Sequence, residues 1–188
     1  TYYSYHINIS HIDKGLIMLR DLVKDVHTEA ENRPFAKLLM SGEISPTQYA
    51  NYLYQQEPMY HALERRADEL GMLKDIPNIK RGLKITADFH NLRIAEPFEL
   101  FQSTKEYCTY VSKISQQQCW AHIYVRHFGD MYGGNMIRKL VPGSASMYEF
   151  EDKGKLISYV RDKLTKDMEG EAKQVFKYAI TLFKELEN

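Results

Sequence analysis

The sequence predicts an all-α fold, and three observations lead to this prediction. Apolar residues recur at alternating steps of three and four along most of the chain, which is the spacing of one face of an α-helix. Prolines, glycines and serines separate these segments as helix ends do, and no stretch shows the alternation typical of a β-strand. With 188 residues and no long linker, the chain is expected to form one domain over residues 1–188, with an irregular lead-in at 1–9.

Composition narrows the classes of function. The 25 basic and 25 acidic residues cancel, so the overall charge gives no sign of nucleic-acid binding. No run approaches the roughly 20 apolar residues of a membrane span. Cys108 and Cys119 lack zinc or disulfide spacing, which favours a reducing environment. We therefore expect a soluble, cytoplasmic protein that has neither a nucleic acid nor a membrane as partner.

The first predicted helix begins near Ser10, which with Asp13 has the pattern of a capping box. Its core stripe consists of Ile12, Leu16, Leu19, Val23 and Val26.

Arg20, Lys24 and His27 lie beside that stripe, again at steps of four and three. Such a face is ordinarily a solvated basic edge. It also suits a flat ligand along the helix, because His27 would bind its metal while the two cations would hold its carboxylates. Glu31, one turn later, would then accept the other ring N–H of His27 and fix its tautomer.

Turn and capping signals divide the middle and end of the chain into further helices. They are predicted over residues 34–41, 46–70 with a Ser45 cap and a kink near Pro58, 76–95, 103–114 with a Ser103 or Thr104 cap, 155–164 and 172–186. Glu57, His61 and Glu64 share a face of the second of these, which suggests a metal. A di-iron carboxylate bundle is poorly supported, however, because the chain has no Glu-x-x-His motif. His61 is therefore expected to be structural.

The segment from Ala121 to Leu140 reads as one helix with three glycines in its middle. Gly129, Gly133 and Gly134 together cost a helix about 3 kcal/mol relative to alanine, so something should compensate. Gly129 and Gly133 share a face, and a face without side chains lets a flat object lie against the backbone. The alternative is that the glycines allow tight helix–helix crossing. Asp130 beside this patch is costly unless water, a partner or a ligand uses it.

Two motifs together closely resemble those of the haem oxygenases. They are VHTEAEN at residues 26–32 and YVRHFGDMYGG at residues 124–134. Supporting matches are PMYHALE at 58–64, YEFE at 148–151 and the pair Phe176 and Phe183. The resemblance covers the chain from about Ile12 to its C-terminus. It implies a helical bundle with haem between a proximal helix and a kinked distal helix.

The resemblance also implies roles for residues on both sides of the haem. On the proximal side it makes His27 the axial iron ligand and Glu31 its hydrogen-bond partner, with Arg20, Lys24 and Arg161 near the haem propionates. On the distal side it makes Asp130 the organiser of water, places Gly129 and Gly133 with Gly134 against the haem, and puts Tyr60, Tyr124 and Arg126 in the surrounding polar network. Phe176 and Phe183 match aromatic residues of the pocket wall. Tyr132 departs from the pattern, which usually has a small serine there.

The activity that the resemblance implies is cleavage of haem b by O2 to biliverdin, expected as the IXα isomer, with release of CO and ferrous iron. The soluble plant and bacterial type is implied, with reduced ferredoxin as electron donor and a bilin reductase as a possible next enzyme. Arg20, Lys24, Arg138 and Lys139 would attract such an acidic donor. Two rivals stay open: a haem carrier or sensor on the same fold, and a non-haem enzyme with a nucleophilic cysteine.

Overall fold

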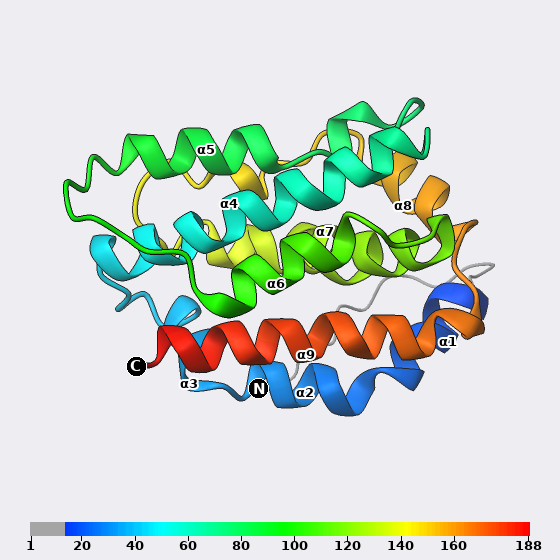
Figure 1. Ribbon diagram of the computed structural model, residues 1–188, viewed down its shortest axis with the longest axis horizontal. Coiled ribbons are helices and arrows are strands. Elements are labelled where there is room, and N and C mark those ends of the chain that lie inside the picture. The colour runs from blue at the N-terminus through cyan, green and yellow to red at the C-terminus, as the bar shows by residue number, and fades with distance from the viewer. Residues whose placement is uncertain (1–13) are drawn as a thin grey trace.

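The computed structural model describes residues 14–188, with side chains from Met18 onward, and it confirms the all-α prediction (Figure 1). No strand occurs within these residues. The helices are α1 Lys14–Leu22, α2 Lys24–Glu31, α3 Pro34–Leu39, α4 Pro46–Glu69, α5 Gly82–Asn91, α6 Gln102–Val111, α7 Gln116–Ile137, α8 Lys153–Arg161 and α9 Glu169–Leu186, with short 3-10 turns η1 Pro77–Ile79, η2 Ser146–Tyr148 and η3 Lys166–Met168. The lead-in at 1–9, the cap at Ser10 and Asp13, and the side chains of Ile12 and Leu16 lie outside what is described.

The two longest helices begin with capping boxes. The Ser45 hydroxyl accepts the N–H of Gln48, and the Gln48 side chain accepts the N–H of Ser45, at 3.1 and 2.9 Å. Ser115 and Gln118 repeat this arrangement at the start of α7. These residues satisfy backbone donors that would otherwise have no partner in the first turn. The Ser45 cap is thus confirmed, and α4 then runs without a break through Pro58 to Glu69.

Three predicted helices differ from the structure in more than their exact ends. The first is two helices, α1 and α2, because the buried Val23 leaves helical geometry with φ −100° and ψ 6°. Residues 76–95 form η1 and then α5. The helix α6 starts after Phe101 without a side-chain cap, because Ser103 bonds to Glu185 and Thr104 bonds to Gln55 instead. Long-range contacts have overridden the local capping signal.

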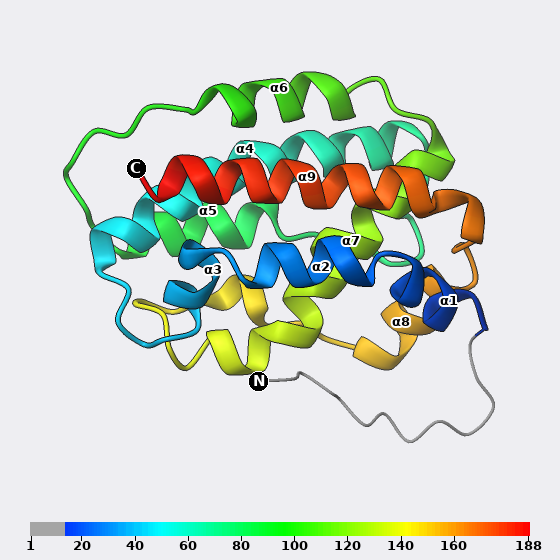
Figure 2. The same ribbon diagram turned by 90° about the horizontal axis from the view of Figure 1, so that it is seen from below.

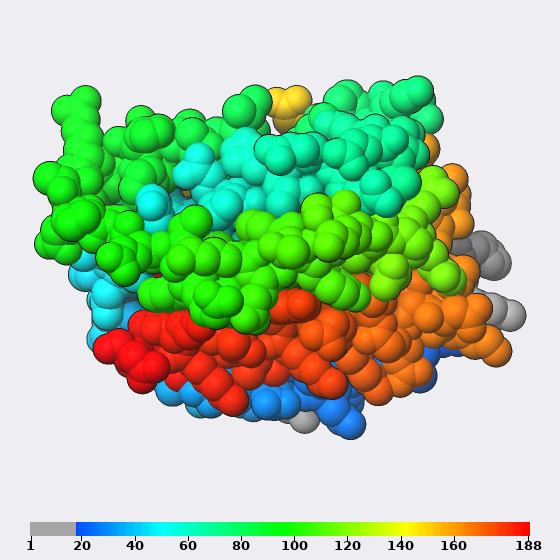
Figure 3. Space-filling view, in the orientation of Figure 1, coloured from blue at the N-terminus to red at the C-terminus, as the bar shows by residue number. Residues whose placement is uncertain are grey.

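The helix α9 holds both sides of the bundle together. It packs against α7 and α2, and Figure 2 shows it running beside α2. Its buried side chains are Ala172, Val175, Ile180 and Leu182. Figure 3 shows α6 and α9 covering much of one face of the molecule. In the part of the chain described, no helix has both the length and the apolar character needed to span a membrane.

A clamp holds the segment after α7 in place. The Asp88 carboxylate of α5 accepts four hydrogen bonds, from the hydroxyls of Ser144 and Ser146 and from the backbone N–H groups of Ser146 and Met147, at 2.6–2.9 Å. The buried guanidinium of Arg81 donates to the carbonyls of Met147 and Glu149 at 3.2 and 2.7 Å. These contacts fix Tyr148 against α7.

Candidate functional site

His27 lies on the proximal helix α2 with half of its side chain exposed. Its Nε2 is 3.0 Å from Oε1 of Glu31, one turn later, as the spacing predicts. The hydrogen bond from His27 lowers the pKa of the Glu31 carboxyl. The imidazole also lies 5.3 Å from the ring of Phe176 on α9. With Nε2 held by Glu31, Nδ1 is the ring nitrogen left for a metal in this arrangement.

The other residues predicted for the ligand's edge are spread over three helices. Arg20 and Lys24 are exposed, and the break at Val23 puts them on α1 and α2 respectively. Arg161 ends α8, at the same end of the molecule as α1, and bonds to the Ser158 hydroxyl at 3.3 Å (Figures 1 and 2). Its guanidinium is partly buried.

Tyr124 lies near Arg20, and its expected place in the distal polar network stays a prediction. No hydrogen bond among the described residues joins it to Asp130, Arg126 or Tyr60. Burial raises the pKa of its hydroxyl to about 12, and the positive charge of Arg20 opposes that rise. Its ring packs edge-on against Phe128 at 6.1 Å.

Phe176 and Phe183 lie on the same side of α9 but meet different partners. Phe183 stacks on Phe35 of α3 with 5.9 Å between ring centres, whereas Phe176 lies beside His27. Seven residues separate these two aromatics, which is about two helical turns. Only Phe176 contacts the predicted metal ligand, His27.

The three glycines of α7 serve two purposes. A Cβ at Gly129 would meet nothing within 4 Å, and one at Gly133 would make only ordinary contact with Ile137 at 3.6 Å. A Cβ at Gly134 would lie 2.9 Å from Cβ of Tyr148, so this glycine allows close packing. The tight-crossing interpretation thus accounts for Gly134, and its expected contact with the ligand stays a prediction. Gly129 and Gly133 leave the backbone open.

We expect alanine at these positions to change stability in opposite directions. Gly129→Ala should raise the free energy of unfolding by up to about 1 kcal/mol, because it gains helix propensity and meets no neighbour. Gly134→Ala should lower it by about 1–2 kcal/mol, because the clamp leaves Tyr148 little room to move. Urea denaturation of the protein without ligand measures both. Stabilisation by Gly134→Ala would show that Tyr148 yields easily.

Asp130 is hydrogen-bonded by the hydroxyl of Tyr60, which is buried on α4. Burial raises the pKa of the Asp130 carboxyl to about 6, against the lowering effects of the Tyr60 hydrogen bond and of nearby positive charge on Arg126 and Arg81. A carboxyl with such a pKa exchanges a proton near neutral pH. It lies next to the open backbone at Gly129, so its proton is available where a ligand would lie on α7.

Arg126 is buried in a polar network behind Asp130. Its guanidinium donates to Gln56 at 2.8 Å and to the Tyr107 hydroxyl at 2.9 Å, and it lies over the Tyr60 ring at 5.5 Å. The network continues from Tyr107 to Nδ1 of the buried His122 at 2.7 Å, and from His122 Nε2 to Glu171 at 2.8 Å. The structure thus brings Arg126 to Tyr60, while the functional roles expected of both stay predictions.

Sequence reasoning did not find the partners of this network. Tyr107, His122 and Glu171 come from three helices, and no role at the site was expected for any of them. Glu64 and His127 do lie within the motifs at 58–64 and 124–134, but no role was expected for either, and their side chains lie 3.0 Å apart between α4 and α7. The only signal was that buried polar residues on helix faces require partners.

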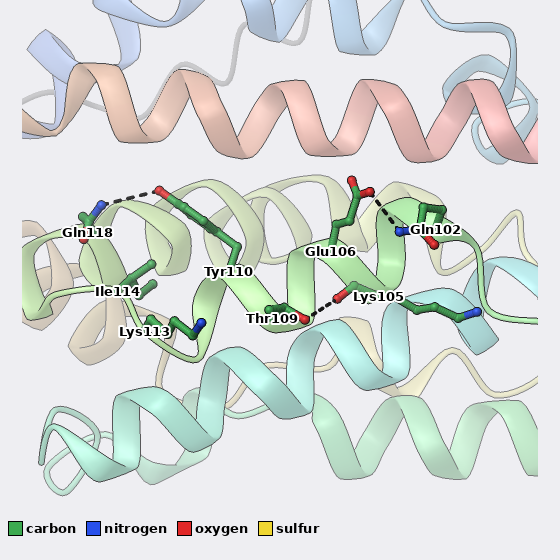
Figure 4. Close-up of a pocket in the computed structure, with 8 residues that line it drawn as sticks. All are labelled: Gln102, Lys105, Glu106, Thr109, Tyr110, Lys113, Ile114 and Gln118. Carbon is green, nitrogen blue, oxygen red and sulfur yellow. Dashed lines mark hydrogen bonds between the residues drawn. The ribbon is translucent and has the colours of Figure 1, made fainter.

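A surface hollow of about 600 Å³ lies on the outer side of α6 (Figure 4). Its lining includes Lys105, Lys113, Tyr110 and Gln118, and none of the predicted site residues. The Tyr110 hydroxyl and the Gln118 amide both bond to Glu171, at 2.7 and 3.2 Å. The hollow therefore lies behind the buried network and apart from the open backbone of α7.

The structure argues against two other candidate sites, a metal site at Glu57 and His61 and a nucleophilic cysteine. Thr86 occupies the position between Glu57 and His61, at 2.7 and 3.2 Å, and the described residues include no cluster of three His, Cys, Asp or Glu side chains suited to a metal. Burial raises the pKa of Cys119 to about 12 and also raises that of Cys108. Both thiols are therefore protonated and poor nucleophiles near neutral pH.

Comparison with known proteins points to one family. The family model described as "Heme oxygenase" matches residues 16–185. The chain is 27% identical to a heme oxygenase of Guillardia theta, over 91% of this chain and 85% of that protein. It is 26% identical to heme oxygenase 1 of Bos taurus, over 65% of this chain and 46% of that protein.

Solved structures show the same fold. A heme oxygenase of Leptospira interrogans matches with a TM-score of 0.79 and 24% identity, over 90% of this chain and 98% of that one. Heme oxygenase-1 of the cyanobacterium Synechocystis, in complex with heme, matches with a TM-score of 0.77 and 21% identity, over 92% and 91% of the two chains. With the matched family model, these findings place the chain in the haem oxygenase family.

Proposed function

We propose that this chain cleaves haem b with O2 to biliverdin, as the IXα isomer, and releases CO and ferrous iron. The observation that carries this proposal is Asp130, a carboxyl with a pKa of about 6 beside the bare backbone of Gly129. A haem carrier needs the open backbone but has no use for a proton-exchanging group next to it. The Asp130 carboxyl therefore favours an enzyme over a carrier or sensor.

The residues present fit haem. His27 offers an imidazole nitrogen at the surface of α2, and Gly129 leaves bare backbone with open space where any other side chain would stand. Arg20, Lys24 and Arg161 supply cations for the two carboxylates. Bound haem supplies the iron that binds and reduces O2, and its porphyrin is the substrate that is oxidised.

The chain's own residues then control orientation and protons. Gly129 and Gly133 let the ring lie against α7, so no side chain blocks the edge to be oxidised. Asp130, held by Tyr60, keeps water within reach and gives up or takes a proton near neutral pH. Tyr132, which precedes Gly133 in the chain, packs edge-on against Phe128 at 5.8 Å.

Anaerobic addition of haem, followed by reductant and then air, tests the proposed function. We expect a nitrogen-ligated haem spectrum, then its loss with formation of bile pigment, which chromatography identifies by isomer. A stable haem spectrum without pigment would mean a carrier. Gly129→Ala should weaken haem binding, since its methyl group would occupy the open patch. The variant should stay folded.

We also propose a cytoplasmic protein with reduced ferredoxin as donor and a bilin reductase as consumer of the product. Exposed cations at Arg20, Lys24 and Lys139 support an acidic donor. Arg138, also expected to contribute, is paired with Glu149 and adds less charge.

Lys139→Glu should lower the rate of ferredoxin-driven turnover, and rising salt should do the same, because both weaken an encounter between opposite charges. The control is turnover driven by ascorbate, which should not respond to either change. If ferredoxin-driven turnover is equally indifferent, the donor does not dock through these cations.

A further inference from the structure

Glu64 is a buried carboxylate with three N–H donors. Its Oε1 lies 3.0 Å from Nε2 of His127 and 2.5 Å from the backbone nitrogen of Arg81, and its Oε2 accepts the N–H of Gly82 at 3.1 Å. Burial alone would raise the pKa of this carboxyl, but the hydrogen bonds from His127 and from the two backbone groups outweigh burial and lower it. Glu64 is therefore ionised and can only accept hydrogen bonds.

This acceptor fixes the hydrogen on His127. Because an ionised carboxylate cannot donate, Nε2 of His127 must carry the hydrogen between them. The imidazole is fully buried, and its Nδ1 has no hydrogen-bond partner among the described residues. Buried ring nitrogens without a partner are uncommon. A carboxylate that orients an imidazole and leaves the other nitrogen free is an arrangement suited to taking up a proton.

The His127 ring also contacts a residue of the distal site. The His127 ring packs edge-on against Tyr60 with 5.0 Å between ring centres, and the hydroxyl of that same Tyr60 donates to Asp130. His127 and Asp130 are three residues apart on α7, on neighbouring positions of one face. The charged and titratable groups around His127 are Glu64 and Tyr60 from α4, Arg81 from the segment before α5, and Arg126 and Asp130 from α7.

We propose that His127, oriented by Glu64, is a positioning residue that sets the proton occupancy of the Asp130 carboxyl and so the pH range in which the distal site works. When His127 takes a proton on Nδ1, its positive charge favours the ionised form of Asp130. When His127 is neutral, Asp130 holds its own proton more firmly. The proposal rests on the proposed function, because it gives Asp130 a proton to deliver.

The test is an NMR titration of the protein without haem, with labelled aspartate carboxyls and histidine rings. The Asp130 signal is the one missing in Asp130→Asn. His127→Gln keeps an amide donor near the place of Nε2 but removes the titrating ring. We expect this variant to raise the midpoint of the Asp130 titration by about one pH unit, because a positive neighbour has been lost. An unchanged midpoint would overturn the proposal.

Two further variants keep the test specific. Glu64→Gln should move the Asp130 midpoint in the same direction, because His127 loses the charge that supports its protonated form. His122→Gln is the matched control, since His122 is also buried on α7 but bonds to Tyr107 and Glu171; it should leave the midpoint in place. An equal shift in His122→Gln, or a neutral His127 ring with its hydrogen on Nδ1, would contradict the proposal. All these readouts are independent of bilin formation, so they stand even if the proposed activity is absent.

Discussion

His27→Ala should abolish the nitrogen-ligated spectrum of added haem and all pigment formation. His27 is the imidazole whose partner, Glu31, lies one turn away and whose ring rests on Phe176. Its side chain is half exposed, so its loss should change the free energy of unfolding by no more than about 0.5 kcal/mol. The variant should therefore stay folded and lose the ligand specifically. Absorption spectra of ferric and ferrous haem measure the change.

Two comparisons separate ligation from general damage. His90→Ala removes an exposed histidine of α5 whose ring packs on Phe89, and it should leave the spectrum intact. Glu31→Gln should keep the ligand but weaken metal affinity about 10–100-fold, as outer partners of metal ligands do. Free imidazole should restore the spectrum of His27→Ala by occupying the vacated space. An unchanged haem spectrum in His27→Ala would remove this residue as ligand.

Local signals predicted the parts of the fold that are decided locally. Ser45 is followed by Pro46 and Gln48, which together suffice to begin α4 wherever it packs. Ser103 carries the same kind of signal, but its hydroxyl is used by Glu185, 82 residues away. The break at Val23 has no sequence signal either, because Val23 fits the core stripe of an unbroken helix and is buried as that stripe predicts. Tertiary contacts, which spacing does not reveal, overrode the signal at Ser103.

The candidate site likewise contains residues that local sequence signals could predict and residues that they could not. Gly129 and Asp130 could be found because their cost within a helix is visible in the sequence. Spacing alone could not find the partner that holds Asp130, since Tyr60 is 70 residues away and reaches it through the packing of α4 on α7; only the family resemblance pointed to Tyr60. Gly134 shows the limit of the pattern: it looks like its neighbours in sequence, but Tyr148 accounts for it.

Asp130→Asn should stabilise the protein and destroy its activity. The pKa of the carboxyl is about 6 in the folded protein against an ordinary value of 3.8. The folded state thus holds the proton more tightly than the unfolded state. The free-energy cost of ionising Asp130 in the folded protein is therefore zero below about pH 4, grows between pH 4 and 6, and reaches its full value above pH 6. This full cost is on the order of 2 kcal/mol after allowance for partial exposure. The amide side chain of Asp130→Asn carries no charge and so avoids this cost.

The stability gain is therefore expected at pH 8 and should vanish near pH 4. Thermal unfolding should show a midpoint higher by roughly 4–8 °C at pH 8, given the size of the chain. Asp88→Asn is the matched control, because Asp88 is also buried but its carboxylate accepts four hydrogen bonds. Replacing it should lower stability by about 1–3 kcal/mol, since an amide presents N–H groups to donors.

Turnover should fall about 100-fold or more in Asp130→Asn, while haem still binds through His27. Oxygen should then be consumed with release of hydrogen peroxide, because a neutral amide orders water but cannot exchange a proton with it. A residue that delivers protons can be retained even though its ionised form lowers the stability of the fold. Replacing a merely structural residue would instead lower stability and activity together. Normal biliverdin formation by the amide variant, or a stability that does not change with pH relative to the parent protein, would separate Asp130 from the chemistry.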